Sequence, residues 1–222
     1  MAVTDNLVAY YGLVTNPNDS VGSNNGTDIN ITYTTGTGAS GCASFSGSSS
    51  RIIWPSSLGA LVSGDFSVSF WVKPTSVADA QFFTDWNVGN RNIYILMFAG
   101  TLYFYSGNGS TSQDGFISTS TLSAGNIYHL TFTRSGTSHK IYINGSLDNS
   151  ATLTQSGGTS GQPVTFGYYQ GANSDWYSGL ASTIWLHNRE LTSGEVSTLY
   201  NSGTPLEYTP STIKPNALFF SV

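Results

Sequence analysis

The chain has 222 residues, 39% of them hydrophobic and 14% aromatic, which suits one all-β domain with a substantial core. Only 9% of the residues are charged, the net charge is -5 and no basic run occurs, which argues against nucleic acid and anionic lipid as partners. No apolar stretch approaches the ~18 residues that a membrane span needs, so we expect no membrane insertion. Cys42 is the only cysteine, which excludes an intrachain disulfide and a cysteine-based metal site.

Short alternating segments separated by Gly, Asn and Ser fill most of the chain, a pattern typical of a sandwich or barrel. In residues 65–74 the apolar side chains alternate with a second row that holds polar residues and Trp71. Residues 92–100 are apolar on both faces, so we expect a central strand that other elements cover on both sides. Residues 101–109 follow Gly100 and are predicted to form a hairpin with the strand over residues 92–100.

Further strands are predicted in the second half of the chain. Residues 127–136 alternate between apolar and polar side chains. Asn144-Gly145 lies between two alternating segments and is the strongest short hairpin signal, because both central residues of that turn need a positive φ. Residues 163–169 and 179–191 are predicted to form two more strands.

One helix interrupts the strands at residues 191–203. Thr192 is placed as its N-cap, and Glu195 three residues later completes a capping box. Gly203 is placed to end the helix, since glycine is the usual residue after a helix C-terminus. We expect this short helix to pack over one end of the sandwich.

The tail over residues 206–222 contains prolines and ends in an apolar cluster of Leu218, Phe219 and Phe220. An exposed apolar cluster on a lone monomer promotes association. We therefore expect the tail to dock on its own domain or on a neighbouring subunit, the second case giving a homo-oligomer. The predicted division is a β-sandwich over residues 1–205 followed by this docking tail.

Five segments in a fixed order resemble the laminin G-like, concanavalin A-like jelly-roll domains, and the resemblance covers residues 6–203. It implies an all-β fold, a two-sheet antiparallel jelly-roll β-sandwich, to which the helix predicted above adds one short C-terminal helix. Members of this family include lectins, glycan-binding modules, adhesion proteins and some glycosidases or lyases, so the resemblance is more specific for fold than for function. The matching segments are residues 7–13, 16–27, 66–76, 127–147 and 176–200.

The resemblance also implies calcium near the early Asp/Asn/Gly loop, opposite a late acidic strand. Here the matching late residues are Ala181, Ser182 and Thr183, so that partner carboxylate is missing. Calcium takes about 6–8 oxygen ligands, usually including carboxylates. The alternative is a run of Asx turns, in which the side chains bond their own backbone. Under the calcium interpretation, the ligands would include Asp19, Asn24, Asn25 and Asp28.

The carboxylates do not form the pattern of a glycosidase, which needs two of them at roughly 5–9.5 Å across one bond. The family's glucanases carry Glu-x-Asp-x-x-Glu or Glu-x-Asp-x-Glu on one strand, and neither motif occurs here. Asp85 and Asp175 each lie beside a tryptophan and are the only pair that invites a catalytic role, although aspartate is ordinary in turns. We therefore predict no catalytic residues and no enzyme activity.

Two glycine-containing segments combine aromatic rings, which cover the apolar faces of sugars, with amides that bond hydroxyl groups. The candidate ligand-binding residues are Trp86, Asn87, Arg91 and Asn92 in the first segment, and Tyr169, Asn173, Asp175 and Trp176 in the second. The outward face of a sheet with Trp71, His129 and Tyr142 is a further candidate. The same residue types occur in plain packing and in protein interfaces, so a protein partner stays open.

Two functions fit these features. The first is a non-catalytic, lectin-like structural or adhesion protein on the surface of a phage or virus particle, such as a head decoration, head fibre or tail protein, with glycans or other virion proteins as partners. The N-terminus lacks a basic region followed by an apolar run, so no secretory signal is visible. The alternative is a free or excised carbohydrate-binding module of a secreted polysaccharide-active protein. The expected location is the virion surface or the extracellular space.

Overall fold

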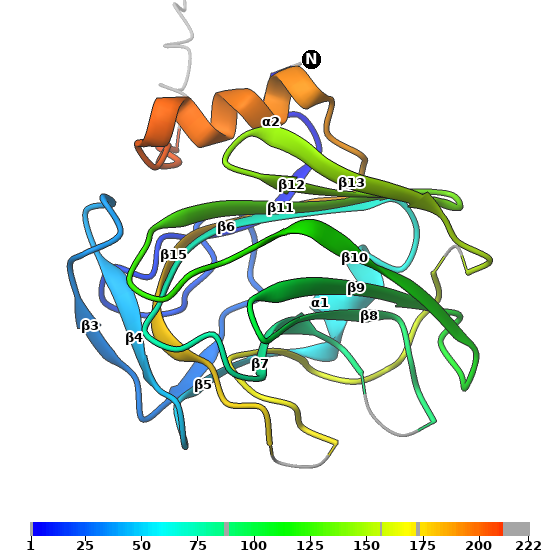
Figure 1. Cartoon of the computed structure of the whole chain (residues 1–222), viewed down its shortest axis with the longest axis horizontal. Coiled ribbons are helices and arrows are strands. Elements are labelled where there is room, and N and C mark those ends of the chain that lie inside the picture. Colours follow the sequence, from blue (N-terminus) through cyan, green and yellow to red (C-terminus); the bar gives the residue numbers. More distant parts are fainter. Residues whose placement is uncertain (1, 87–88, 156, 172–173, 211–222) are drawn as a thin grey trace, which may run out of the picture.

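The fold consists of two antiparallel β-sheets stacked face to face (Figure 1). The computed structural model describes residues 2–86, 89–155, 157–171 and 174–210. In order across the first sheet lie β13 (Ser146–Thr152), β12 (Ser138–Ile143), β11 (Tyr128–Ser135), β6 (Phe66–Pro74), β15 (Ser178–His187), β4 (Cys42–Ser46) and β3 (Thr32–Thr34), and β1 (Leu7–Tyr11) pairs with β15.

The second sheet runs in order through β10 (Gln113–Thr121), β9 (Thr101–Gly107), β8 (Ile93–Phe98), β7 (Ala80–Thr84), β14 (Val164–Phe166), β5 (Arg51–Trp54) and β2 (Thr27–Ile29). Two α-helices accompany the sheets in the described residues, α1 (Ser56–Leu61) and α2 (Ser193–Tyr200). The expected two-sheet antiparallel sandwich with a short C-terminal helix is confirmed.

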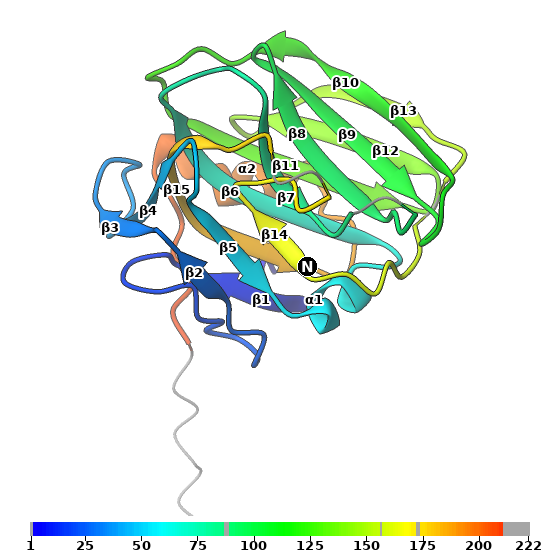
Figure 2. The same cartoon turned by 90° about the horizontal axis from the view of Figure 1, so that it is seen from below.

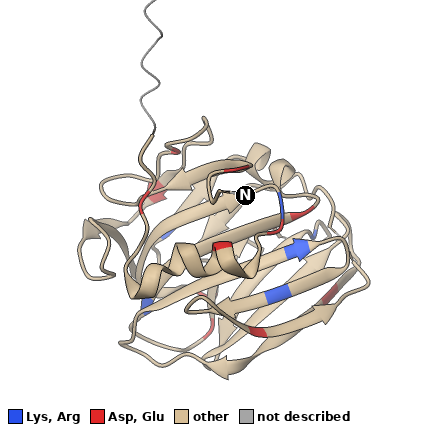
Figure 3. Ribbon diagram, turned by 90° about the horizontal axis from the view of Figure 1, so that it is seen from above, with Lys and Arg blue, Asp and Glu red and all other residues tan. Residues whose placement is uncertain are grey.

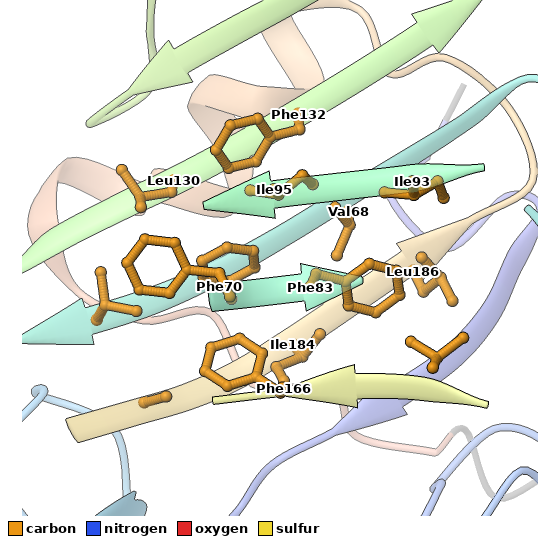
Figure 4. Close-up of a cluster of buried hydrophobic side chains, with 14 of the residues drawn as sticks. Val68, Phe70, Phe83, Ile93, Ile95, Leu130, Phe132, Phe166, Ile184 and Leu186 are labelled. Atoms are coloured by element: carbon orange, nitrogen blue, oxygen red, sulfur yellow. The ribbon is translucent and has the colours of Figure 1, made fainter. Parts of the chain in front are cut away.

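The core lies between the sheets and is filled by alternate side chains of facing strands (Figure 4). Val68 and Phe70 of β6 are fully buried, as are Leu130 and Phe132 of the neighbouring β11. The register sets Val68 opposite Phe132 and Phe70 opposite Leu130, so the apolar rows of the two strands coincide. Burying a side chain of this size contributes about 1.5–3 kcal/mol. The alternation predicted for β6 and β11 is confirmed.

Strand β8 differs from its prediction as a strand covered on both sides. Its inner row is buried, with Ile95 and Met97 fully inaccessible. Its outer row remains open, since Tyr94 and Leu96 are half-buried and Phe98 is 49% exposed. Tyr94 and Phe98 of the outer row pack against rings of β9, its predicted hairpin partner, rather than beneath a further layer. Double coverage was therefore wrong, and an apolar face remains at the surface.

Helix α2 begins as predicted and ends earlier. The Thr192 hydroxyl accepts a hydrogen bond from the Glu195 amide, and the Glu195 carboxylate accepts one from the Thr192 amide, which confirms the capping box. Asn201, with φ of 46°, occupies the left-handed C-cap position. Asparagine tolerates this conformation, so Gly203 lies in the following 3-10 turn rather than at the helix end.

Helix α2 lies across the outer face of the first sheet and not over an end of the sandwich (Figures 1 and 3). The Tyr200 ring stacks on Trp71 at 5.8 Å between ring centroids. Trp71, His129 and Tyr142 are consequently almost completely buried. The outward face proposed from these three residues as a ligand site is therefore covered by the protein's own helix, and that prediction is wrong.

The predicted hairpin between β12 and β13 is confirmed and also supports α2. Asn144 and Gly145 have φ values of 51° and 78°, as this turn requires. A Cβ atom on Gly145 would lie 2.8 Å from the Tyr200 ring. Glycine is therefore needed here both for the turn and for the close approach of the helix.

Helix α1 was not predicted. It has six residues after Pro55, and no side chain caps its N-terminus. Only Leu58 and Gly59 within it are buried. So short a helix shows less than two turns of periodicity, which is too little to distinguish it from a loop.

The start of the tail contacts the sandwich. Leu206 and Tyr208 pack on the cluster that contains Tyr10 and Trp185, and the Trp185 indole N–H donates a hydrogen bond to the Leu206 carbonyl at 3.2 Å. The apolar cluster at the end of the tail lies outside the described residues. The division of the chain into a sandwich and a docking tail stays a prediction.

We expect the free energy of unfolding to fall as the pH drops from about 6.5 to about 4. Burial lowers the pKa of His129 to about 3 and the pKa values of His139 and His187 to about 4. The unfolded chain takes up these protons near pH ~6.5, before the native protein does. The stability is therefore present above that pH and is lost as the pH falls through the folded pKa values.

Urea unfolding between about pH 7 and pH 4 measures this loss as a falling midpoint. Protonation of Asp85 raises the free energy of unfolding as the pH falls, because burial raises the pKa of this carboxyl group to about 7 in the folded protein. Three histidines outweigh this one carboxyl group. A midpoint that stays constant or rises over this range would contradict the prediction.

Candidate ligand-binding site

The outer face of β8 and β9 carries an open depression of about 450 Å³. Antiparallel pairing sets Tyr94 opposite Tyr105 and Leu96 opposite Tyr103, so alternate side chains of both strands share this face. Figure 2 shows β8, β9 and β10 side by side. We call this surface the aromatic face, and its lining residues are Trp86, Tyr94, Leu96, Phe98, Tyr103, Tyr105 and Gln113.

The rings of the aromatic face form a continuous series. The Tyr94 and Tyr105 centroids lie 5.8 Å apart, and Tyr103 stacks beside Tyr105 at 6.2 Å with an interplanar angle of 14°. Phe98 meets Tyr103 edge-on at 6.3 Å. Beyond the other end, Tyr169 lies 5.6 Å from Tyr94. Neighbouring rings in this arrangement present a broad apolar surface on which a flat ligand can stack.

Contacts beneath the rings hold the aromatic face in place. Gln81 is fully buried, and its amide donates a hydrogen bond to the Tyr94 hydroxyl at 2.7 Å. Burial raises the pKa of Tyr94 to about 12, so its ring stays neutral at ordinary pH. Tyr105 lies against Gly115, where a Cβ atom would come within 2.2 Å of the ring. A face held in this way loses little conformational entropy when a ligand binds.

Arg91 is the charged group at the edge of the aromatic face. Its guanidinium lies 5.4 Å from the centre of the Trp86 ring, and its Nη1 donates to Gln113 Oε1 at 2.6 Å and to the Thr111 carbonyl at 2.8 Å. In the part of the chain that the structure describes, Arg91 forms no salt bridge. Charged residues are spread over the fold rather than gathered into one patch (Figure 3). The aromatic face therefore offers stacking and a few polar contacts, and no acidic group is among its described lining residues.

The structure brings the two predicted binding segments together at this face. Trp86 of the first segment and Tyr169 of the second both pack on Tyr94, with centroid distances of 5.1 and 5.6 Å. Trp86 is only 4% exposed, so it supports the face more than it adds area to it. Asn87 and Asn173 lie outside the described residues.

Asn92 has a structural role that the sequence did not reveal. It is fully buried, its amide nitrogen donates to Asp85 Oδ2 at 2.9 Å, and its oxygen accepts from Arg134 Nη1 at 3.1 Å. These bonds use both ends of the amide, so the side chain cannot reach a ligand at the surface. We leave Asn92 out of the proposed site.

Asp85 and Asp175 do not face one bond. Asp85 is fully buried and accepts hydrogen bonds from the Ile93 amide at 2.7 Å and the Ser160 hydroxyl at 3.1 Å, as well as from Asn92. Asp175 lines a separate surface depression together with Trp176. The two carboxylates that the sequence offered for catalysis are thus one internal group and one surface group.

The early Asp/Asn/Gly loop is held by its own backbone. Asp19 accepts hydrogen bonds from the amides of Tyr10 at 3.2 Å, Val21 at 3.0 Å and Asn24 at 3.2 Å, and its own amide donates to Asn25 Oδ1 at 3.0 Å. The Val21 contact, from the amide two residues after Asp19, is that of an Asx turn, and the others tie the loop to itself and to β1. Three backbone N–H groups donate to the two carboxylate oxygens of Asp19, so these oxygens do not fit the role of calcium ligands.

Asp28 is the other carboxylate of the predicted calcium set. It lies on β2 and accepts a hydrogen bond from the Tyr33 hydroxyl at 2.7 Å. Within the described residues, no group of three or more His, Cys, Asp or Glu side chains is arranged to hold a metal ion. The contacts of Asp28 thus add no support to the calcium interpretation.

We expect millimolar calcium to leave the melting temperature unchanged, because binding would have to displace three N–H donors from Asp19. Thermal unfolding in EDTA and in excess calcium measures the difference. A rise that EDTA reverses, and that Asp19→Asn abolishes, would establish the calcium site instead.

Most of the aromatic face was missed from the sequence. The missed lining residues are Tyr94, Leu96, Phe98, Tyr103, Tyr105 and Gln113. The available signal was the spacing of large side chains at every second position of two paired strands. Because the row at the other positions is equally apolar, this pattern also fits a strand buried on both sides.

Comparisons with known proteins agree on one fold. The family model described as the concanavalin A-like lectin/glucanases superfamily matches residues 46–197. A search of curated protein sequences finds no match. In the described part of the chain, neither helix is long and apolar enough to cross a membrane.

Several solved structures are similar to this chain. Domain 4 of AbnA, a GH43 extracellular arabinanase from Geobacillus stearothermophilus in complex with arabinotriose, has a TM-score of 0.71 and 24% identity, covering 87% of this chain and 98% of that domain. The binding domain of Paraclostridial Mosquitocidal Protein 1 has a TM-score of 0.74 and 20% identity, covering 93% of this chain and 57% of its own length.

The binding domain of botulinum neurotoxin DC in complex with SialylT has a TM-score of 0.70 and 13% identity, covering 91% of this chain and 53% of its own length. This chain therefore spans nearly the whole arabinanase domain but little more than half of either toxin binding domain. At these identities the likeness is one of fold.

Proposed function

Because this chain belongs to the concanavalin A-like lectin/glucanase superfamily, we propose that it is a non-catalytic glycan-binding protein whose ligand lies on the aromatic face. The observation that carries the proposal is the open series of rings from Tyr169 through Tyr94, Tyr105 and Tyr103 to Phe98. Sugar rings have apolar C–H faces that pack on aromatic rings, while amides at the edge bond their hydroxyl groups. Gln113 and Arg91 supply such polar groups here.

The absence of a catalytic role is part of the proposal. No carboxylate lines the aromatic face in the described residues, and glycoside hydrolysis needs a pair of them. The comparison structures include a receptor-binding domain of a toxin and a domain of an arabinanase, which are binding domains by name or by bound sugar. These points favour recognition over bond cleavage.

Two settings for such a protein follow from the sequence. The first is the surface of a phage or virus particle, where the domain would serve in decoration or adhesion. The second is a carbohydrate-binding module of an extracellular polysaccharide-active protein, and the likeness to a complete domain of an extracellular arabinanase favours it. In both settings the protein acts outside the cell that makes it.

Light scattering after size-exclusion chromatography separates the two settings. For a particle component we expect the intact chain to associate and a variant that ends at Pro205 to be monomeric. Monomers in both cases would count against assembly through the tail.

A glycan array followed by isothermal titration tests glycan binding itself. We expect binding of a neutral oligosaccharide by the intact chain, with quenching of tyrosine and tryptophan fluorescence as the rings are covered. The absence of binding across plant, bacterial and animal glycans would overturn the proposed function.

A further inference from the structure

A second depression lies close to the aromatic face. Its volume is about 430 Å³. A β-bridge joins Tyr169, which contacts the aromatic face, to Ser174, which directly precedes two lining residues of this depression, Asp175 and Trp176. We call it the rim pocket, and its polar and aromatic lining residues are Ser46, Ser76, Asp79, Asp175, Trp176 and Ser178.

The lining of the rim pocket combines one aromatic wall with several hydrogen-bond acceptors. Trp176 stacks on Tyr168 at 5.1 Å and 18°, and the Arg51 guanidinium lies 5.7 Å from the Trp176 ring, which fixes the indole. Asp79 and Asp175 form no salt bridge within the described residues. Carboxylates accept hydrogen bonds from pairs of hydroxyl groups, and an indole covers an apolar sugar face.

One buried residue joins the two depressions. The Gln81 amide nitrogen donates to the Tyr94 hydroxyl at 2.7 Å and, more weakly, to Asp175 Oδ2 at 3.4 Å. Its backbone amide also donates to the Asp175 carbonyl at 3.0 Å. Because one side chain contacts a lining residue of each depression, they lie close together in a fixed geometry. One extended ligand can therefore contact both depressions.

We propose that the rim pocket is a second saccharide subsite, and that the ligand is an oligosaccharide long enough to occupy it and the aromatic face at once. This inference rests on the proposed glycan-binding function. The sugar units in the rim pocket carry free hydroxyl groups and no carboxylate or sulfate, because Asp79 and Asp175 would repel an anionic group there. The substrate class is thus a neutral linear glycan rather than a single terminal sugar.

Titration of the full chain with oligosaccharides of increasing length tests this inference. Series of neutral arabinan, xylan and β-glucan fragments, from trisaccharide to octasaccharide, serve as probes. For the series that binds, we expect affinity to rise at least about tenfold with length as the second subsite is filled. Asp175→Asn and Trp176→Ala should abolish this rise and leave trisaccharide affinity unchanged.

The variants are chosen so that a folding defect cannot imitate the result. Asp175 has φ of 55°, and asparagine is the replacement that best tolerates this backbone. Asp79 is exposed, and its side chain forms no hydrogen bond or salt bridge within the described residues, so Asp79→Asn is a second test of the acceptors. Leu147→Ser, at a side chain 54% exposed on β13, is the control that should keep the full length dependence.

Affinity that is independent of length in the intact chain, or a length dependence that survives in Asp175→Asn, Asp79→Asn and Trp176→Ala, would overturn the second subsite and leave glycan binding on the aromatic face intact. A length-dependent gain for oligogalacturonate that exceeds the gain for neutral chains would also overturn it. No binding to any probe would overturn the proposed function together with this inference.

Discussion

Replacing Tyr103 and Tyr105 together by alanine is expected to lower glycan affinity about 100-fold, since a loss of about 1.4 kcal/mol for each ring is tenfold. Both rings are half-buried on the outer face of β9 and stack on each other at 6.2 Å. Their removal takes away the centre of the aromatic face, where the contacts that dominate binding usually lie. Isothermal titration with the oligosaccharide that binds the intact chain measures the loss.

Three variants make this result specific. Tyr103→Phe with Tyr105→Phe keeps the ring faces and should retain most of the affinity. Tyr33→Ala removes a half-buried ring from β3 in the other sheet and should bind as the intact chain does. Gly115→Ala should weaken binding without deleting any ring, because its Cβ would displace Tyr105. If the double alanine variant bound normally, the ligand would have to lie elsewhere.

Replacing Arg134 by alanine is expected to lower the free energy of unfolding by about 3–5 kcal/mol, the cost of leaving buried charged and polar groups without partners. Arg134 is fully buried. Its Nη2 donates to the carbonyls of Val62 and Gly64, both at 2.6 Å, and its Nη1 to the Ser106 hydroxyl at 2.9 Å. The alanine variant leaves these acceptors unpaired.

The same substitution removes the positive charge that balances Asp85. Asn92 lies between the two groups and bonds both, so Asp85, Asn92 and Arg134 form one buried network. Residue 85 directly precedes Trp86, and Asn92 directly follows Arg91, so the network fixes the backbone next to these two residues of the aromatic face and its edge. We therefore expect the variant to lose glycan affinity as well as stability.

Urea unfolding measures the loss in the free energy of unfolding, and Lys140→Ala is the matched control. Lys140 pairs with Glu190 at 2.7 Å, and both side chains remain partly exposed, so its loss should cost no more than about 1 kcal/mol. If the Arg134→Ala variant were as stable as the Lys140→Ala variant, the buried network would contribute nothing to the free energy of unfolding.

The local parts of the fold were predictable from the sequence because their causes lie within a few residues. The Asn144-Gly145 turn follows from the need for two positive φ angles, and the Thr192–Glu195 capping box from two side chains that bond each other's backbone. The alternation of apolar and other side chains in β6 likewise predicts which side chains face inward. Each of these predictions holds without knowledge of the remaining chain.

The candidate site was only partly predictable. The two loops that hold Trp86 and Tyr169 were identified from composition, and the structure brings both to Tyr94. Nothing in the local sequence indicates that Asn92 turns inward to Asp85 and Arg134, because Arg134 is 42 positions away in the chain. Whether an amide binds a ligand or a buried charge depends on such distant partners.

By itself, the sequence determined the strand alternation, the tight turn, the helix start and hence the class of fold. Only the tertiary structure decided which apolar sheet face is covered and which is open. Helix α2 lies over Trp71 and His129 on one sheet, whereas no helix or strand of the described chain covers Tyr94 and Tyr105 on the other. Both faces carry aromatic residues, so composition cannot distinguish them. The difference arises because burial of a face depends on segments that are distant in sequence and pack against it only in the folded chain.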